Sequence, residues 1–256
     1  MSRDKCYMCD KDATSVEHVP PKCLFPELKD SGSNYRINLI TVPSCDLHNG
    51  KKSTDDEFLM VSIAGILGNN SIGYEHYHGK IQRSLKRSSY KLLKQVFLKG
   101  EVLRVTDHNK FMDLLWGTPD HPRLMDCFRH IAYGIHRHHF GENFVGTVKP
   151  YLSFIHPTEN NPQEFKKFIE HKAKIDLHGQ VKHGNNQGVF YYQFTDPDQY
   201  GIYLGSLCFY QNVNIYISYL PENFSPPFNF GIELLNGGFE TTIILEDKEY
   251  KFNQPK

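Results

Sequence analysis

Four soft metal ligands lie in two short turns before residue 50 of this chain. The first turn is Cys-x-x-Cys and the second is Cys-x-x-His, and the ligands are Cys6, Cys9, Cys45 and His48. Turns with this spacing, called knuckles below, are typical of tetrahedral zinc sites, where thiolate and imidazole are the preferred ligands. The sequence therefore predicts a structural zinc ion held by both knuckles.

A second group of polar residues lies between and beside the zinc ligands. Glu17 and His18 are consecutive, Asn38 lies between the two knuckles, and Asn49 directly follows the last ligand. A carboxylate and an amide oxygen suit Mg²⁺ or Mn²⁺, which prefer oxygen ligands. An imidazole with a pKa of about 6.5 suits a general base at neutral pH. We therefore expect the zinc site to hold a catalytic set in place.

Together these residues resemble the motif of the HNH endonucleases, also called His-Me finger or ββα-metal endonucleases. The matching segments agree in order and spacing and cover about the first quarter of the chain; they are Glu17-His18, Asn38-Leu39 and Cys45-x-x-His48-Asn49-x-x-Lys52. Three positions depart from the usual pattern: Glu replaces Asp, His replaces the fourth Cys, and Asn stands at the last motif position. Family members with Asn at that position exist, among them phage Holliday-junction resolvases.

The resemblance implies a role for each residue of the second set. His18 would be the general base that deprotonates an attacking water, and Asn38 would orient it. Glu17 and Asn49 would hold one Mg²⁺ or Mn²⁺ ion that stabilises charge on the leaving oxygen. The implied activity is hydrolysis of DNA phosphodiester bonds to 5′-phosphate and 3′-hydroxyl ends, in a setting such as phage defence or a mobile element.

Basic residues after the motif indicate where DNA phosphates would be held. Lys51 and Lys52 lie at the start of an expected helix. The segment from Lys80 to Lys99 holds seven basic residues and no acid. On the expected amphipathic helix, one face carries Lys80, Arg83, Arg87, Lys91 and Lys94. In a nuclease this face would follow the DNA backbone, although by itself it is equally typical of a solvated helix surface.

The sequence leaves two alternative ligand assignments open. Cys23 would replace His48 in the zinc site, which would leave His48 for catalysis, but the spacing of Cys45 and His48 favours the knuckle. Asp56 would replace Asn49 as the oxygen ligand, although a helix cap or an ion pair with a lysine suits Asp56 better.

The patterns predict an α+β protein with three regions. Residues 1–60 form the zinc-supported ββα-metal unit, residues 61–145 are mostly helical, and residues 146–256 form a mostly antiparallel β region without a chemical motif of its own. In the first region we expect strands at 15–19 and 35–42 and a helix from Asn49 onward. In the last region we expect a helix at 162–173 and strands at 188–194, 200–210, 212–220, 230–235 and 241–245.

The overall composition limits the class of protein. The formal net charge of zero gives no global field that attracts nucleic acid, so any DNA contact must be local. We find neither an apolar signal segment near Met1 nor a run of about 18–20 apolar residues. We therefore expect a cytoplasmic protein with reduced cysteines and no membrane contact.

A competing hypothesis is a non-catalytic zinc-binding module that docks nucleic acid or a protein. The set of Glu17, His18 and Asn49 discriminates between the two, because a binding module has no use for it. A single site of this kind cuts one strand. Double-strand cleavage would therefore need a homodimer or two binding events, and the long C-terminal region suits a regulatory partner.

Overall fold

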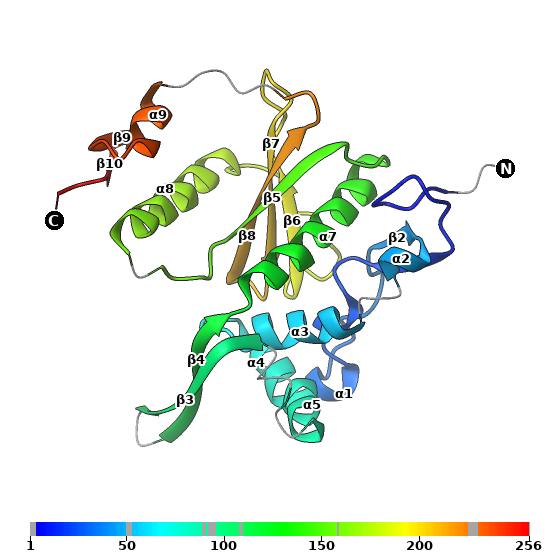
Figure 1. The fold of residues 1–256 in the computed structure, drawn as a ribbon. Coiled ribbons are helices and arrows are strands. Elements are labelled where there is room, and N and C mark those ends of the chain that lie inside the picture. The colour runs from blue at the N-terminus through cyan, green and yellow to red at the C-terminus, as the bar shows by residue number, and fades with distance from the viewer. Residues whose placement is uncertain are drawn as a thin grey trace. The chain divides into compact units, whose positions relative to one another are not determined.

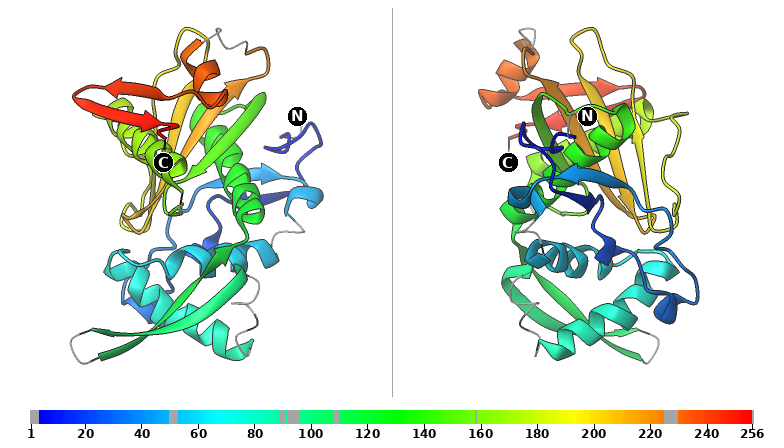
Figure 2. Two further views of the ribbon diagram at one scale, coloured as in Figure 1. Left: turned by 60° about the vertical axis from the view of Figure 1, so that its left-hand side comes forward. Right: turned by 90° about the vertical axis from the view of Figure 1, so that its right-hand side faces the viewer.

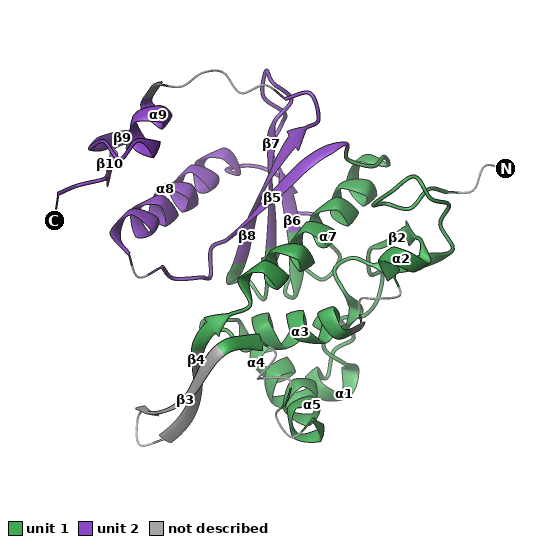
Figure 3. Ribbon diagram, viewed as in Figure 1, with its two compact units in different colours: residues 1–144, 184–191, 208–213 green, residues 145–183, 192–207, 214–256 purple. Residues whose placement is uncertain are grey.

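The computed structural model describes residues 4–49, 53–88, 91, 96–107, 110–157, 159–224 and 230–255. The chain forms two compact units (Figure 3). Unit 1 comprises residues 1–144, 184–191 and 208–213, and unit 2 comprises residues 145–183, 192–207 and 214–256. The junction after residue 144 lies beside the boundary predicted at 145/146. The predicted regions 1–60 and 61–145, by contrast, belong to one unit.

The predicted mixture of helices and sheets is confirmed, and unit 1 begins with a short hairpin. Strands β1 (Ser15–His18) and β2 (Thr41–Ser44) pair antiparallel, with Glu17 opposite Val42 and His18 opposite Thr41. The first predicted strand is confirmed, whereas the second begins at Thr41 instead of Tyr35. Residues 35–40 instead form a turn and irregular backbone, and there the side chain of Arg36 donates from Nε to the Phe25 carbonyl at 2.9 Å.

Among the helices of unit 1 that precede β3 (Phe97–Asp107), α2 (Asp46–Asn49) lies beside this hairpin (Figure 1). In chain order these helices are η1 (Lys22–Leu24), α1 (Leu28–Ser31), α2 (Asp46–Asn49), α3 (Ser53–Ala64), α4 (Ser71–His76), η2 (Tyr77–Ile81) and α5 (Gln82–Arg87). The predicted basic helix is therefore helical through Arg87, and Lys94 lies outside the described residues.

The prediction of a mostly helical middle region is wrong for one long segment. Strands β3 (Phe97–Asp107) and β4 (Lys110–Pro119) form an antiparallel hairpin there. Val102, Val105 and Thr106 give this stretch the β-branched character that strands prefer. The segment Asp107-His-Asn supplies residues that favour a turn. The chain then enters α7 (His121–Phe140), where Asp120 caps the N-terminus by accepting from the Arg123 N–H.

Helix α7 packs against the elements that carry the candidate site. A Cβ atom added at Gly134 would lie 2.8 Å from Val19 Cγ1, so only glycine permits this close approach. Arg123 of α7 donates from Nε to Asp55 at the start of α3, at 2.8 Å. Its guanidinium also lies 4.2 Å from the centre of the Phe58 ring. Hydrophobic packing and a charged contact therefore join α7, α3 and the chain after β1.

Most residues of a four-stranded sheet with the strand order β5-β8-β7-β6 belong to unit 2. Its strands are β5 (Gly146–Leu152), β6 (Phe190–Phe194), β7 (Tyr203–Phe209) and β8 (Val213–Pro221). The three predicted strands between residues 188 and 220 are confirmed. The edge strand β5, which pairs antiparallel with β8, is absent from the sequence-based prediction.

Helix α8 (Asn160–Asp176) lies beside the C-terminal hairpin of β9 (Thr241–Leu245) and β10 (Lys248–Phe252) (Figures 1 and 2). Edge-to-face aromatic pairs join α8 to β5 and to β10: Phe165 packs against Tyr151 of β5, and Phe168 packs against Tyr250 of β10. The predicted helix at 162–173 is confirmed. The strand predicted at 230–235 is wrong, because Phe230–Asn236 forms helix α9.

Candidate metal centre and active site

The four predicted zinc ligands converge in the structure. Their ligand atoms all lie within 4.8 Å of one another. His48 Nδ1 lies 3.3 Å from Cys6 Sγ, 3.6 Å from Cys9 Sγ and 3.4 Å from Cys45 Sγ. Tetrahedral zinc, with bonds of about 2.3 Å to sulfur and 2.0–2.1 Å to nitrogen, places its ligands roughly 3.5–3.8 Å apart. The cluster can therefore hold a metal ion such as zinc.

Backbone contacts fix each knuckle. In the second knuckle, the N–H groups of His48 and Asn49 both donate to the Cys45 carbonyl at 3.0 Å. In the first knuckle, the Cys6 carbonyl accepts from Asn143 Nδ2 at 2.7 Å. Cys6 and Cys45 are almost fully enclosed. The backbone bonds therefore hold two buried thiols in place.

The alternative zinc ligand, Cys23, lies elsewhere. Its thiol donates to the backbone carbonyl of Asp56 at 3.2 Å. Burial raises the pKa of Cys23 to about 12, so it stays a protonated thiol, whereas a zinc ligand is a thiolate. The arrangement with Cys23 in place of His48 is therefore not the one that the structure contains.

Glu17 and His18 occupy the end of β1 in different surroundings. Glu17 is 7% exposed, while His18 is partly exposed. Burial lowers the pKa of His18, Lys22 lowers it further, and Glu17 opposes both effects. The imidazole is consequently neutral at pH 7, the state in which a histidine accepts a proton. Its ring makes no hydrogen bond with any residue that the structure describes.

Asn49 approaches the same strand from the second knuckle. Its Nδ2 donates to Ser15 Oγ at 2.8 Å, which fixes the amide group. Alternate residues of a strand face the same side, so Ser15 and Glu17 share one face of β1. The Asn49 amide therefore lies on the face of β1 that carries the Glu17 carboxylate. Since the amide nitrogen is engaged, the oxygen Oδ1 is the atom suited to a hard cation.

Asp56 also lies near this face. It is partly buried in the first turn of α3, and its charge, like that of Glu17, contributes to raising the pKa of Tyr7. The alternative in which Asp56 supplies an oxygen ligand therefore stays open.

Asn38 lies in the turn before β2, and the structure records no hydrogen bond between it and His18. It is exposed and adopts a left-handed backbone with φ of 52°. Its carbonyl accepts from Asn185 Nδ2 at 2.9 Å. His18 is instead fixed through the backbone, since the next residue, Val19, donates to the Ile40 carbonyl at 3.0 Å. The orienting role of Asn38 stays a prediction.

The predicted DNA-binding cations fall into three groups. Lys51, Lys52 and Lys94 lie outside the described residues, and Lys91 is exposed. The others line a hollow of about 400 Å³, together with two lysines and an acid that the prediction did not include; the full lining is Glu27, Lys29, Lys80, Arg83, Lys86 and Arg87. Lys86 belongs to the same basic run but lies outside the predicted face.

Acids of α1 and its flank pair with part of this cationic hollow. Arg83 forms two hydrogen bonds to the Asp30 carboxylate, at 2.7 and 2.8 Å. Lys80 lies 3.7 Å from Glu27. Lys86 and Arg87 form no ion pair with a described residue and are exposed. These two side chains are therefore the cations of the hollow best placed to meet an external phosphate.

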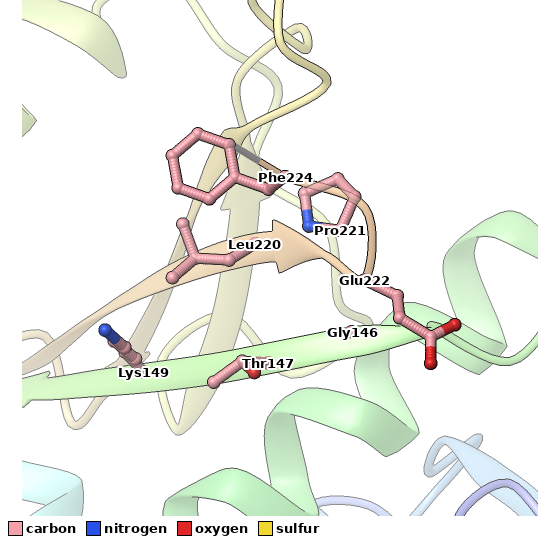
Figure 4. Close-up of a pocket in the computed structure, with 7 residues that line it drawn as sticks. All are labelled: Gly146, Thr147, Lys149, Leu220, Pro221, Glu222 and Phe224. Carbon is pink, nitrogen blue, oxygen red and sulfur yellow. The ribbon is translucent and has the colours of Figure 1, made fainter. Parts of the chain in front are cut away.

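A second hollow, of about 360 Å³, lies in unit 2 between the start of β5 and the end of β8 (Figure 4). Lys149 and Glu222 are the charged residues among those that line it. Their charges are opposite, and Glu222 points to one end of the hollow while Lys149 lies at the other. This arrangement indicates no specific ligand.

Comparisons with known proteins found no match for this chain. No family model matches the chain, and no curated protein or solved structure matches it either. None of the described helices is long and apolar enough to cross a membrane.

Proposed function

We propose that this chain is a metal-dependent endonuclease that hydrolyses DNA phosphodiester bonds. The observation that carries the proposal is the link between the metal cluster and β1. Asn49, which follows the zinc ligand His48, is bonded to Ser15, and Glu17 and His18 follow on the same strand. A zinc-binding module has no need of a carboxylate and a neutral histidine at this position.

The proposed reaction assigns one proton transfer to His18. A ring nitrogen of His18 takes a proton from water, and the water oxygen forms a bond to phosphorus. The bond between phosphorus and the 3′ oxygen breaks, and that oxygen takes up a proton from solvent. Glu17 and Asn49 Oδ1 would hold Mg²⁺ or Mn²⁺, whose Lewis acidity would stabilise charge on the phosphoryl and leaving oxygens.

The chemistry of the ends tests this assignment. Supercoiled plasmid nicked by the protein should be resealed by a DNA ligase without prior treatment, because the proposed cleavage leaves a 5′-phosphate and a 3′-hydroxyl. Nicks that resist resealing until a 3′-phosphate is removed would contradict the proposed bond cleavage. Binding of plasmid without any nicking would favour the competing zinc-binding module, which the burial of Glu17 also suits.

The cationic hollow gives a prediction about DNA binding. Replacing both Lys86 and Arg87 with Ala is expected to weaken binding to a duplex and to reduce the slope of log K against log salt. The slope should fall by about one for each phosphate that the variant no longer neutralises. Fluorescence anisotropy over a series of NaCl concentrations, without Mg²⁺, measures both quantities.

Lys149→Ala is the matched control, because it removes an exposed lysine from unit 2. It should leave the salt slope unchanged if the contact is specific to the hollow. Equal slopes for wild type and the Lys86/Arg87 double variant would exclude the hollow from the DNA interface.

A further inference from the structure

We propose that Asn185 and Asn186 are positioning residues, which clamp the turn before β2 and thereby hold His18 at the end of β1. The inference rests on the proposed function in one respect, namely that His18 is the general base. Both asparagines lie far from the motif in sequence, in the segment Gly184–Tyr191. That segment belongs to unit 1, although the residues on both sides of it belong to unit 2.

Two side-chain hydrogen bonds form the clamp. Asn185 Nδ2 donates to the Asn38 carbonyl at 2.9 Å, and Asn186 Nδ2 donates to the Ile37 carbonyl at 3.0 Å. Residues 35–40 lie outside any helix or strand, so their backbone groups depend on partners other than a regular ladder. Two adjacent amides therefore fix two consecutive carbonyls of the turn.

The clamped turn leads directly into the strand that pairs with His18. A single residue separates Asn38 from Ile40, whose carbonyl accepts from the Val19 N–H at 3.0 Å. Thr41, the next residue, lies opposite His18 in the hairpin. A displacement of the turn would therefore move the backbone bond that follows His18.

The segment that carries the clamp is itself anchored. The Asn186 carbonyl accepts from the N–H groups of Val189 and Phe190, at 2.8 and 2.9 Å. Asn70, which caps α4, donates from Nδ2 to the Gly188 carbonyl at 2.7 Å. Val189 and Phe190 are almost fully buried. The two asparagines consequently reach the turn from a fixed base in unit 1.

Replacing both asparagines with Ala removes the two donors and keeps the backbone bonds of their own segment. Two typical hydrogen bonds together shift a local opening equilibrium by roughly 10–100-fold. We therefore expect the Val19 amide to exchange with deuterium at least about tenfold faster than in wild type. Zinc content should not change, and the melting temperature should stay close to that of wild type.

The same variant should nick plasmid more slowly. A misplaced catalytic group lowers the rate of the chemical step, so the maximal nicking rate should fall by about tenfold or more. The plasmid concentration that gives half of this rate should not change, because the asparagines are not proposed to bind DNA. This separation distinguishes positioning of His18 from a contact with the substrate.

Asn212→Ala is the matched control. Asn212 is another exposed asparagine of unit 1, and its Nδ2 donates to the Leu67 carbonyl at 3.3 Å. This variant loses a bond of the same kind that does not reach the turn before β2. Its Val19 exchange and its nicking rate should equal those of wild type.

The experiment follows amide exchange by NMR on the zinc-loaded full chain, with zinc content and thermal unfolding measured for each sample. Single-turnover nicking is measured over a range of plasmid concentrations. Faster Val19 exchange together with a lower maximal rate in the double variant supports the proposal. Wild-type exchange at Val19, a maximal rate equal to that of wild type, or equal acceleration of exchange in Asn212→Ala would each overturn it.

Two further outcomes are also decisive. If the double variant fails to fold, Asn185→Ala carries the test, because Asn185 is exposed and its loss should accelerate Val19 exchange to a smaller extent. Unchanged exchange in that variant would overturn the proposal. If wild type does not nick plasmid, the proposed function fails and with it the catalytic part of this inference, while Val19 exchange still decides whether the asparagines hold the end of β1.

Discussion

Cys6→Ser is expected to release the metal ion and to unfold the first part of the chain. Cys6 is fully buried, and its sulfur lies 3.3 Å from the nitrogen of His48 in the other knuckle. The hairpin that depends on the cluster has four residues in each strand, too few to be stable alone. Structural zinc contributes about 10–16 kcal/mol in small zinc domains, so its loss should outweigh the remaining packing.

Zinc content by mass spectrometry and thermal unfolding measure this effect, and Cys23→Ser is the control. Cys23 Sγ only donates to the Asp56 carbonyl, a bond that a serine hydroxyl can also make. The control should retain zinc and most of its stability. Loss of zinc from Cys23→Ser, or full retention by Cys6→Ser, would show that the ligand set is different.

His18→Ala is expected to reduce the rate of metal-dependent nicking by about 10²–10⁴-fold, the contribution typical of a general base. The protein should keep its zinc, because the His18 ring contacts none of the four ligands through a hydrogen bond. Single-turnover nicking of supercoiled plasmid, compared at equal zinc content, measures the effect.

His171→Ala controls for the loss of a partly buried histidine, since His171 lies in α8 of unit 2. Its nicking rate should equal that of wild type. A rate for His18→Ala within a few-fold of wild type would remove His18 from the mechanism, even if the protein proved to be a nuclease.

The features that could be predicted from the sequence are those that depend on short-range spacing. Two knuckles with the right ligands specify a metal site without knowledge of the fold, and the structure brings all four ligands together. The strand that carries Glu17 and His18 is also predictable, because a few alternating residues suffice to define it. Helix α8 is predictable for a similar reason, since its apolar residues recur at helical spacing.

Other features were predicted wrongly because the same segment suits both a helix and a strand. Residues 80–99 match an amphipathic helix, and this pattern conceals the start of the β3–β4 hairpin. Phe230–Leu235 alternates as a strand would, yet it forms α9. Short apolar segments satisfy both periods, so the surrounding structure decides between them.

Contacts between distant parts of the chain could not be predicted from one sequence. Nothing in the spacing of Ser15 and Asn49 indicates the hydrogen bond between their side chains, which exists because the second knuckle folds onto β1. The pairing of Arg83 with Asp30 likewise requires α1 to lie beside α5. This ion pair changes the interpretation of the basic helix, because it engages Arg83 and leaves Lys86 better placed to meet phosphate.

The most direct test of the central claim is nicking of supercoiled plasmid by the zinc-loaded wild-type protein, with and without Mg²⁺ or Mn²⁺. We expect conversion to open circles only when the divalent ion is added, and little conversion by His18→Ala at the same zinc content. Intact plasmid in every reaction, from folded protein that has retained its zinc, would contradict the assignment as a nuclease and favour the zinc-binding module.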